Sequence, residues 1–316
     1  MHPEITRIQS MLEGQGYVAD QALATSVYLA IQLRKPLLIE GAAGVGKTEV
    51  AKVMARALDT DLIRLQCYEG LDVTTSLYEW NYQRQLLHIR LQEHSDKPLE
   101  AKEREIFSEA FLLKRPLLAA ITHHRPPVLL IDEVDRSDEE WESFLLEVLS
   151  DWQVTIPEIG TIRAQHIPYV VLTSNRTREL GDALRRRCLY LWIDYPALEK
   201  ELAIVRRKIP GINADLAEQI ATFMQLIRRT KLEKAPGIAE TLDWSAALIA
   251  LHRDHLDAEA VEQTIGVLFK HRDDADRVRS QWLDHLLRGV EEAGHEAHPL
   301  TQASVDRVAD RVLPRR

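Results

Sequence analysis

The chain has 316 residues, of which 45% are apolar and 28% charged, with a net charge of −9. The composition is that of a globular protein, the length predicts two domains, and the acidic balance disfavours non-specific nucleic-acid binding, although a local basic patch remains compatible with it. No signal peptide and no apolar run near the ~20 residues of a membrane span are visible, so we expect a cytoplasmic protein. Its two cysteines, Cys67 and Cys188, fit no disulfide or zinc spacing and predict reduced thiols.

The first part of the chain alternates between helical patterns and short apolar runs. Residues 19–33 predict a helix, Leu37–Ile39 a buried strand, and Glu49–Leu58 an amphipathic helix after a glycine-rich turn. Strand, glycine turn and helix together are the opening of a βαβ unit. Further buried strands are expected at Leu62–Leu65, Val128–Ile131, Tyr169–Leu172 and Leu189–Ile193.

The segments between these strands are less regular. Tyr68–Leu91 is aromatic and polar, and we interpret it as an inserted hairpin with a flanking helix. Glu100–Leu118 and Asp138–Leu149 predict helices. Gln153–Ala164 alternates in the manner of a β-hairpin.

Beyond Tyr195-Pro196 the sequence shows helical patterns and no strand pattern. We therefore expect an α/β domain over residues 1–194 and a small all-α lid domain over residues 195–316. The final Leu313–Arg316 is expected to fray. The expected helices of the lid are Glu199–Lys208, Ala214–Arg229, Thr241–Leu251, Asp257–Phe269 and Ser280–Val290.

Residues 41–48 match the pattern G-x-x-x-x-G-K-[ST] without a mismatch. They are Gly41, Ala42, Ala43, Gly44, Val45, Gly46, Lys47 and Thr48. Glycines let backbone N–H groups approach phosphate oxygens and adopt positive φ, and the following helix N-terminus favours negative charge. Lys47 is expected to contact the β- and γ-phosphates, and Thr48 to complete a magnesium shell. Because the strand and helix contexts also fit, the motif predicts a nucleoside triphosphate site, without separating ATP from GTP.

Two carboxylates follow the apolar run Val128–Ile131. Ligands of open α/β sheets bind at the carboxyl ends of the strands, which is where Asp132 and Glu133 would lie. Asp132 is expected to orient the magnesium shell, and Glu133 to polarise the attacking water. A solvated acidic stretch is the alternative, but it does not explain why the acidic residues begin where a buried strand ends.

Asn175 and a run of arginines complete the set of site candidates. Asn175 ends another apolar run and is expected to position the lytic water or contact the γ-phosphate, unless it only forms a turn. The run Arg185–Arg187 follows a short helix, and at least one of its members should be structural. Arg187 is our first choice for an arginine finger that reaches a neighbouring subunit's site, and Arg186 our second.

Some polar residues invite a functional interpretation that is weaker than the ordinary one. His123 and His124 precede two prolines, and His252 and His255 flank Arg253-Asp254. Solvated histidines are favoured over metal sites at both places. Cys188 is expected to be a small buried side chain rather than a nucleophile, because nothing nearby in the sequence would act as its base.

These motifs in this order resemble the MoxR-type AAA+ ATPases. The family likeness lies in Gly41–Thr48, Val128–Arg136, Thr173–Asn175 and Gly181–Cys188. The closest likeness is to the CoxD-type subgroup, which is encoded beside aerobic carbon monoxide dehydrogenase genes. The subgroup-like stretches are Arg64–Gly70, Leu77–Tyr82 and Pro236–Trp244.

The resemblance implies a hexameric ring that binds ATP and Mg²⁺ at subunit interfaces. It also implies a partner with a von Willebrand A domain, and a metalloenzyme client whose metal–sulfur centre is matured, here a molybdenum–copper carbon monoxide dehydrogenase. One departure concerns the second sensor arginine of AAA+ lids. Pro236–Trp244 offers Glu240 and no arginine, which leaves open whether Arg228 or Arg229, one helix earlier, takes its place.

A nucleic-acid motor or loader is the alternative function, since such AAA+ proteins share the same core. The Tyr68–Tyr82 segment carries Glu69, Asp72 and Glu79 and no lysine or arginine, which favours a protein client. A nucleotide-binding switch without turnover is disfavoured, because the residues expected to carry hydrolysis are all present.

Overall fold

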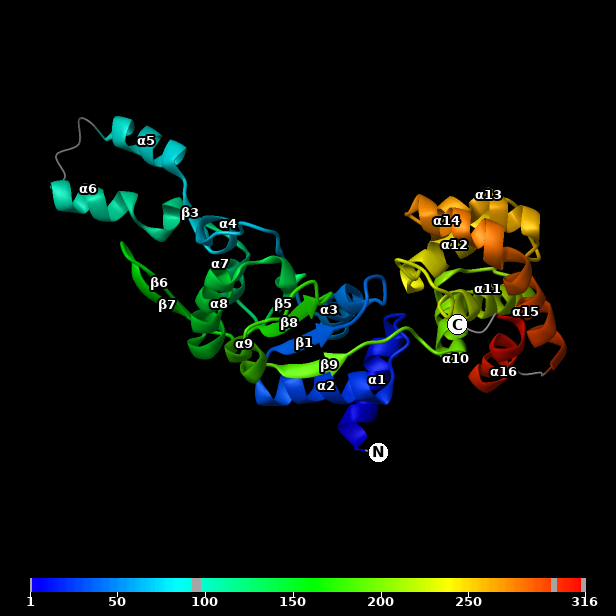
Figure 1. Ribbon diagram of the computed structural model, residues 1–316. Coiled ribbons are helices and arrows are strands. Elements are labelled where there is room, and N and C mark those ends of the chain that lie inside the picture. The colour runs from blue at the N-terminus through cyan, green and yellow to red at the C-terminus, as the bar shows by residue number, and fades with distance from the viewer. Residues whose placement is uncertain (1, 93–97, 297–299, 314–316) are drawn as a thin grey trace. The chain divides into compact units, whose positions relative to one another are not determined.

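The computed structural model describes residues 2–92, 98–296 and 300–313 (Figure 1). It divides the chain into two compact units, each considered by itself below. The first unit comprises Met1–Gln15, Ala19–Gly41 and Lys47–Trp192, and the second comprises Gly16–Val18, Ala42–Gly46 and Ile193–Arg316. The predicted domain boundary after residue 194 stays a prediction.

The first unit is built on a five-stranded sheet in the order β2-β5-β8-β1-β9, in which every neighbouring pair is parallel. The central strands β1 and β5 are buried along their whole length, as expected when helices cover both faces of a parallel sheet. The expected α/β class and all five expected strands are confirmed. The strands are β1 (Leu37–Glu40), β2 (Leu62–Gln66), β5 (Val128–Asp132), β8 (Tyr169–Ser174) and β9 (Leu189–Trp192).

Helices pack around this sheet, and their starts follow from local sequence. The side chains of Asp20 and Asp138 accept backbone N–H groups at the N-termini of α2 and α8, the usual role of aspartate at an N-cap. The apolar stripe of α3, including Val50 and Met54, is buried as its periodicity predicts. The helices are α1 (Pro3–Gly14), which we did not expect, α2 (Gln21–Leu33), α3 (Lys47–Ala57), α7 (Pro116–Ile121), α8 (Glu139–Asp151) and α9 (Asp182–Arg187).

The segment between β2 and β5 differs from the prediction. Strand β3 (Tyr78–Trp80) pairs with β4 (Leu112–Lys114), so the inserted hairpin closes across two helices rather than within residues 68–91. One helix over Glu100–Leu118 is wrong, because the strand pairing removes the middle of that range, and Pro116 starts a new helix instead. The elements of this insertion, whose two longer helices Figure 1 shows near one another, are α4 (Val73–Ser76), β3, α5 (Tyr82–Leu91), α6 (Leu99–Ile106), a 3₁₀ turn (Glu109–Phe111) and β4.

A second hairpin lies between α8 and β8. Its strands, β6 (Gln153–Ile156) and β7 (Gly160–Arg163), pair antiparallel as predicted. The turn between them passes Gly160, whose φ of 96° is one that glycine adopts without strain.

From Ile193 onward, the described residues of the second unit form helices and loops, as expected. Helix α11 is central and buries Phe223 against Trp244 of α12, with ring centroids 5.0 Å apart. Residues 314–316, part of the predicted frayed tail, lie outside the described residues. The helices are α10 (Leu198–Lys208), α11 (Ala214–Ile227), α12 (Ile238–Ala250), α13 (Ala258–Leu268), α14 (Arg272–Arg277), a π-helical turn (Val278–Trp282), α15 (Leu283–Glu296) and α16 (Gln302–Val312).

Candidate active site

Polar side chains gather at the carboxyl edge of the sheet of the first unit, where β2, β5 and β8 end side by side. Asp132 is the last residue of β5, is 2% exposed, and lies in register with Gln66 of β2. Thr173 approaches it from β8, and Thr48 from the start of α3. The edge is therefore the place that parallel α/β sheets use for ligands.

The Asp132 carboxylate is bonded on both oxygens. Its Oδ1 accepts the hydroxyls of Thr173 at 2.5 Å and Thr48 at 3.0 Å, and its Oδ2 accepts Nη2 of Arg64 at 2.6 Å. A hydroxyl and a carboxylate oxygen are the hard ligands that magnesium takes in proteins. The two predicted magnesium residues, Thr48 and Asp132, are thus adjacent and chemically suited to that ion.

Glu133 has an unusual backbone. Its φ of 55° lies in the left-handed region, which costs free energy for a residue other than glycine. The backbone N–H donates to Oγ1 of Thr173 at 2.9 Å, and the carboxylate accepts Nε2 of Gln66 at 3.0 Å and Nη1 of Arg136 at 3.1 Å. Contacts with neighbouring side chains therefore hold Glu133 in a backbone conformation that is unfavourable by itself.

Lys47 and Glu133 are linked through Asn175. The Lys47 ammonium donates to the carbonyl of Gly41 and to Oδ1 of Asn175, both at 2.7 Å, and Nδ2 of Asn175 lies 3.4 Å from Oε1 of Glu133. The structure thus brings together the predicted phosphate lysine, the predicted water-polarising carboxylate and the predicted amide.

Burial and charge act in opposite directions on Lys47. Burial lowers the pKa of its ammonium, whereas the carboxylates of Asp135, Asp132 and Glu133 raise it. Burial is the larger of these influences, so the pKa is lower than for an exposed lysine. Phosphate oxygens would supply the negative charge that a buried ammonium needs.

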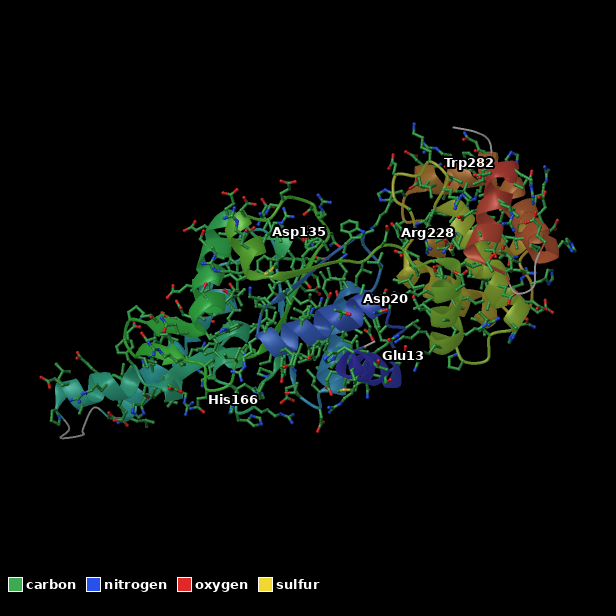
Figure 2. All side chains as sticks on the ribbon, turned by 90° about the horizontal axis from the view of Figure 1, so that it is seen from below. Glu13, Asp20, Asp135, His166, Arg228 and Trp282 are labelled. Carbon is green, nitrogen blue, oxygen red and sulfur yellow. The ribbon has the colours of Figure 1, made fainter. Side chains whose placement is uncertain are left out.

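Asp135 is part of the site, although no sequence pattern distinguishes it from the acidic residues around it. It is 2% exposed, and its carboxylate accepts the backbone N–H of Asn175 at 3.1 Å and that of Thr177 at 2.8 Å. It therefore fixes the loop after β8 that carries Asn175. Figure 2 labels this residue in the first unit.

Arg64 and Gln66 were also missed as site residues. They contact Asp132 and Glu133 only because β2 pairs with β5, which no local pattern shows. The available signal was a charged residue in an otherwise apolar short strand.

Residues 42–46 of the glycine-rich motif group with the second unit. Gly44 and Gly46 have φ values of 78° and 94°, the positive angles for which the motif needs glycine. The N–H of Ala239 donates to the carbonyl of Gly44 at 3.1 Å, and Gly237 packs so closely on Gly44 that a side chain at 237 would collide with it. The stretch that corresponds to the place of the second sensor arginine, Pro236–Trp244, thus contacts this loop within one unit.

The two arginines left open as sensor substitutes are both paired inside the second unit. Arg228 (labelled in Figure 2) binds both carboxylate oxygens of Glu201, at 2.6 and 2.7 Å, and its guanidinium lies 4.9 Å from the Tyr195 ring centroid. Arg229 is bound to Asp306. Neither guanidinium is available to a ligand without breaking these contacts.

The run Arg185–Arg187 is exposed at the end of α9. Arg187, the first choice for a finger, donates to Oγ of Ser150 at 2.7 Å and to the carbonyl of Ala183 at 3.0 Å. The Arg186 side chain makes no hydrogen bond or ion pair within the part of the chain that the structure describes. The hydrogen bonds described for these arginines involve none of the predicted site residues at the sheet edge. Those residues are Lys47, Thr48, Asp132, Glu133 and Asn175.

Residues 36–188 match the family model of the AAA domain, dynein-related subfamily. The chain is 24% identical over 262 residues to an uncharacterized protein of Staphylococcus haemolyticus, covering 81% of this chain and 90% of that one. It is 25% identical over 230 residues to the gas vesicle ATPase GvpN of Haloferax mediterranei, covering 68% of this chain and 64% of GvpN.

Two solved structures that cover most of this chain have TM-scores below 0.5. One is an ATPase structure from Cytophaga hutchinsonii, with 16% identity, a TM-score of 0.48, and coverage of 98% of this chain and 94% of that one. Another is the Holliday junction branch migration motor RuvB of Thermotoga maritima, with 16% identity, a TM-score of 0.44, and coverage of 95% and 87%. At these values the likeness says nothing about what the chain acts on. No helix among the described residues is long and apolar enough to span a membrane.

Proposed function

Because this chain is an AAA+ ATPase, with a P-loop core and the activity of an ATP hydrolase, we propose that it turns over ATP between the subunits of a cytoplasmic, hexameric ring. In this proposal residues 1–194 form the nucleotide-binding domain and residues 195–316 the lid. The linked side chains Lys47, Asn175 and Glu133, beside Asp132, carry the argument for hydrolysis.

Each residue at the sheet edge has a role in this reaction. Lys47 exchanges its contacts with Gly41 and Asn175 for phosphate oxygens, which frees the amide of Asn175 to orient a water. Glu133 accepts a hydrogen bond from that water and polarises it, so that the water attacks the γ-phosphate. Thr48 and Asp132 would hold Mg²⁺, which would neutralise the charge that develops on the phosphate oxygens.

Arg186 is the residue that we now favour as the finger acting on a neighbouring subunit. Arg187 is anchored to Ser150 and Ala183 within its own unit, and redirecting it would break two hydrogen bonds. The exposed Arg186 has no such contact to lose within the described residues. Arg187 then serves to hold the end of α9 in place.

The client that we propose is a protein, and specifically a metalloenzyme under assembly. The resemblance of Arg64–Gly70, Leu77–Tyr82 and Pro236–Trp244 to the CoxD-type subgroup supports a molybdenum–copper carbon monoxide dehydrogenase, with a von Willebrand A domain protein as partner.

The inserted helix α5 supports a protein client over nucleic acid. It leaves Tyr82, Leu86, Leu87 and Leu91 between 58% and 76% exposed, an apolar surface suited to contact with another protein. The net charge of −9 works against a general nucleic-acid motor.

The test is Mg²⁺-dependent ATP hydrolysis by wild type and Glu133→Gln over a range of protein concentrations, with sizing on the same samples. We expect the rate per subunit to rise as rings form, and Glu133→Gln to retain ATP without turnover. Hydrolysis that is independent of assembly would refute the interface site. A variant that turns over normally would remove Glu133 from its role.

A further inference from the structure

Among the described residues, one group of three or more histidine, cysteine and acidic side chains is close enough to hold a metal ion: Asp61, His123 and His124. One ligand atom from each lies within 4.8 Å of the other two. We propose that these residues bind a late transition-metal ion, with Zn²⁺ as the best fit. This site is separate from the Mg²⁺ that hydrolysis requires.

The sheet itself brings the three residues together. Asp61 precedes β2 and the two histidines lie in the loop before β5, and these strands are paired neighbours. The N–H of Val128 donates to the carbonyl of Asp61 at 2.9 Å, and Oγ1 of Thr60 donates to the carbonyl of Pro126 at 2.7 Å. Two loops far apart in the chain are therefore fixed to one another beside the proposed site.

The nitrogen of His123 that faces the carboxylate has a free lone pair when the ring is neutral. Nδ1 lies 2.9 Å from the carbonyl oxygen of Arg125 and 3.4 Å from the backbone nitrogen of the same residue. The shorter contact is a hydrogen bond when Nδ1 carries the proton, because a carbonyl can only accept, and we take this tautomer as the metal-binding one. Nε2 is then an acceptor, and it lies 3.3 Å from Oδ2 of Asp61. A backbone carbonyl that sets the histidine tautomer in this way is the usual outer contact of a metal-binding histidine.

The spacing fits a metal ion between the two atoms. Ligand atoms about 2.0–2.1 Å from a tetrahedral zinc lie roughly 3.3 Å from one another, which is the separation of His123 Nε2 and Asp61 Oδ2. His124 is exposed, its ring centroid lies 4.4 Å from that of His123, and one of its ring nitrogens lies within 4.8 Å of the other two ligand atoms. Three protein ligands leave a fourth position for water.

The ligand types select the metal. Two imidazoles and one carboxylate suit Zn²⁺ and its late transition-metal neighbours, whereas Mg²⁺ prefers oxygen ligands and several waters. The site is at the amino end of the β2–β5 pair, and Asp132 is at the carboxyl end, four residues further along. At about 3.3 Å per residue the two ends are roughly 13 Å apart. The proposed ion therefore does not share ligands with the nucleotide site.

Arg125 competes with the metal. Its Nη2 lies 3.1 Å from the same Oδ2 of Asp61, and its Nη1 donates to the carbonyl of Asp59 at 2.9 Å. A cation bound to Asp61 would have to displace this guanidinium or share the carboxylate with it. Removing the arginine charge should therefore strengthen metal binding, an effect that a random surface histidine would not show.

The experiment uses the full chain, freed of metal with a chelator and kept in excess Mg²⁺, and titrated with Zn²⁺ against a chromogenic chelator. We expect about one Zn²⁺ per chain, at least tenfold weaker binding in His124→Ala and in Asp61→Asn, and tighter binding in Arg125→Gln. His166→Ala, which removes an exposed histidine from another part of the first unit (Figure 2), is the matched control and should bind as wild type does.

Thermal unfolding of each metal-free variant shows whether it is folded, and the visible absorption of a Co²⁺-loaded sample reports on tetrahedral ligands. Wild type that binds no Zn²⁺, or His124→Ala and Asp61→Asn variants that bind as tightly as wild type, would overturn the proposal. If one of these two variants fails to fold, the other and Arg125→Gln still decide the question.

Discussion

Arginines are used differently in the two units. In the second unit Arg228 is 7% exposed and paired on two atoms with the fully buried Glu201, and Arg229 is paired with Asp306. In the first unit Arg64 is half-exposed with one contact to Asp132, and Arg186 has no side-chain partner within the described residues. Arg228 and Arg229 hold helices of the second unit together, whereas Arg64 and Arg186 of the first unit remain accessible.

This difference shows where a nucleotide can find positive charge. A guanidinium in a buried pair cannot be redirected without leaving its carboxylate unpaired, which is costly. A half-exposed or unpaired one can change partner at little cost. We therefore propose a structural role for Arg228, and expect the exposed arginines, Arg64 and Arg186 of the first unit first of all, to be the ones that respond to nucleotide.

The largest expected effect is on turnover in Arg186→Ala. An arginine finger is worth roughly 10³–10⁵ in rate in other nucleotide hydrolases, so a loss on that order is expected while nucleotide affinity changes little. The measurement is steady-state hydrolysis by assembled protein, with Arg187→Ala as the matched variant. Normal turnover in Arg186→Ala together with loss in Arg187→Ala would restore the assignment made from the sequence.

Breaking the buried pair of the second unit should cost stability instead. Glu201→Gln leaves the Arg228 guanidinium buried beside a neutral group, and a loss of about 3–5 kcal/mol in the free energy of unfolding is expected. Urea unfolding measures it. Asp306→Asn is the control, because it removes the half-exposed partner of Arg229 and should cost no more than about 1 kcal/mol. Equal losses in the two variants would contradict the contrast between the pairs.

A smaller effect is expected for Arg64, the half-exposed arginine beside Asp132 in the first unit. Arg64→Gln removes the positive charge beside Oδ2 of Asp132, so the carboxylate should attract Mg²⁺ more strongly. The Mg²⁺ concentration for half-maximal ATP binding should fall, on the order of fivefold for a half-exposed pair. Fluorescent-nucleotide binding over a Mg²⁺ series measures it. An increase in that concentration would mean that Arg64 holds the nucleotide rather than opposing the metal.

At neutral pH the smallest expected effect concerns Cys67, next to the same carboxylate. Burial, followed by the charges of Asp132, Asp135 and Glu133, raises the pKa of the Cys67 thiol from 9.0 to about 12. A raised pKa in the folded state stabilises the fold below pH 9 and loses that contribution as pH rises toward 12. Alkaline unfolding should therefore be steeper in wild type than in Cys67→Ala. Identical pH profiles would show that the surroundings of Cys67 do not raise the pKa of its thiol.

Much of the core follows from local sequence. The strands, the residues of the glycine-rich motif and the Asp132-Glu133 pair are each specified by a run of neighbouring residues, so their positions could be predicted. The contacts of Arg64 and Asp135 could not, because they depend on which strands lie side by side and on the path of a loop. The same limitation explains the error over Glu100–Leu118, where a strand forms only because distant residues pair with it.

Because β3 and β4 pair only with each other among the described strands, the insertion between them is independent of the five-stranded sheet. Strands β3 and β4 form a two-stranded sheet of their own, and both α5 and α6 lie between them in the chain. A lineage could lengthen, shorten or discard the segment from Asn81 to Phe111 and reconnect Trp80 to Leu112 by a tight turn, without altering one hydrogen bond of the five-stranded sheet. The exposed surface of the insertion could then diverge quickly while the five-stranded sheet stays unchanged.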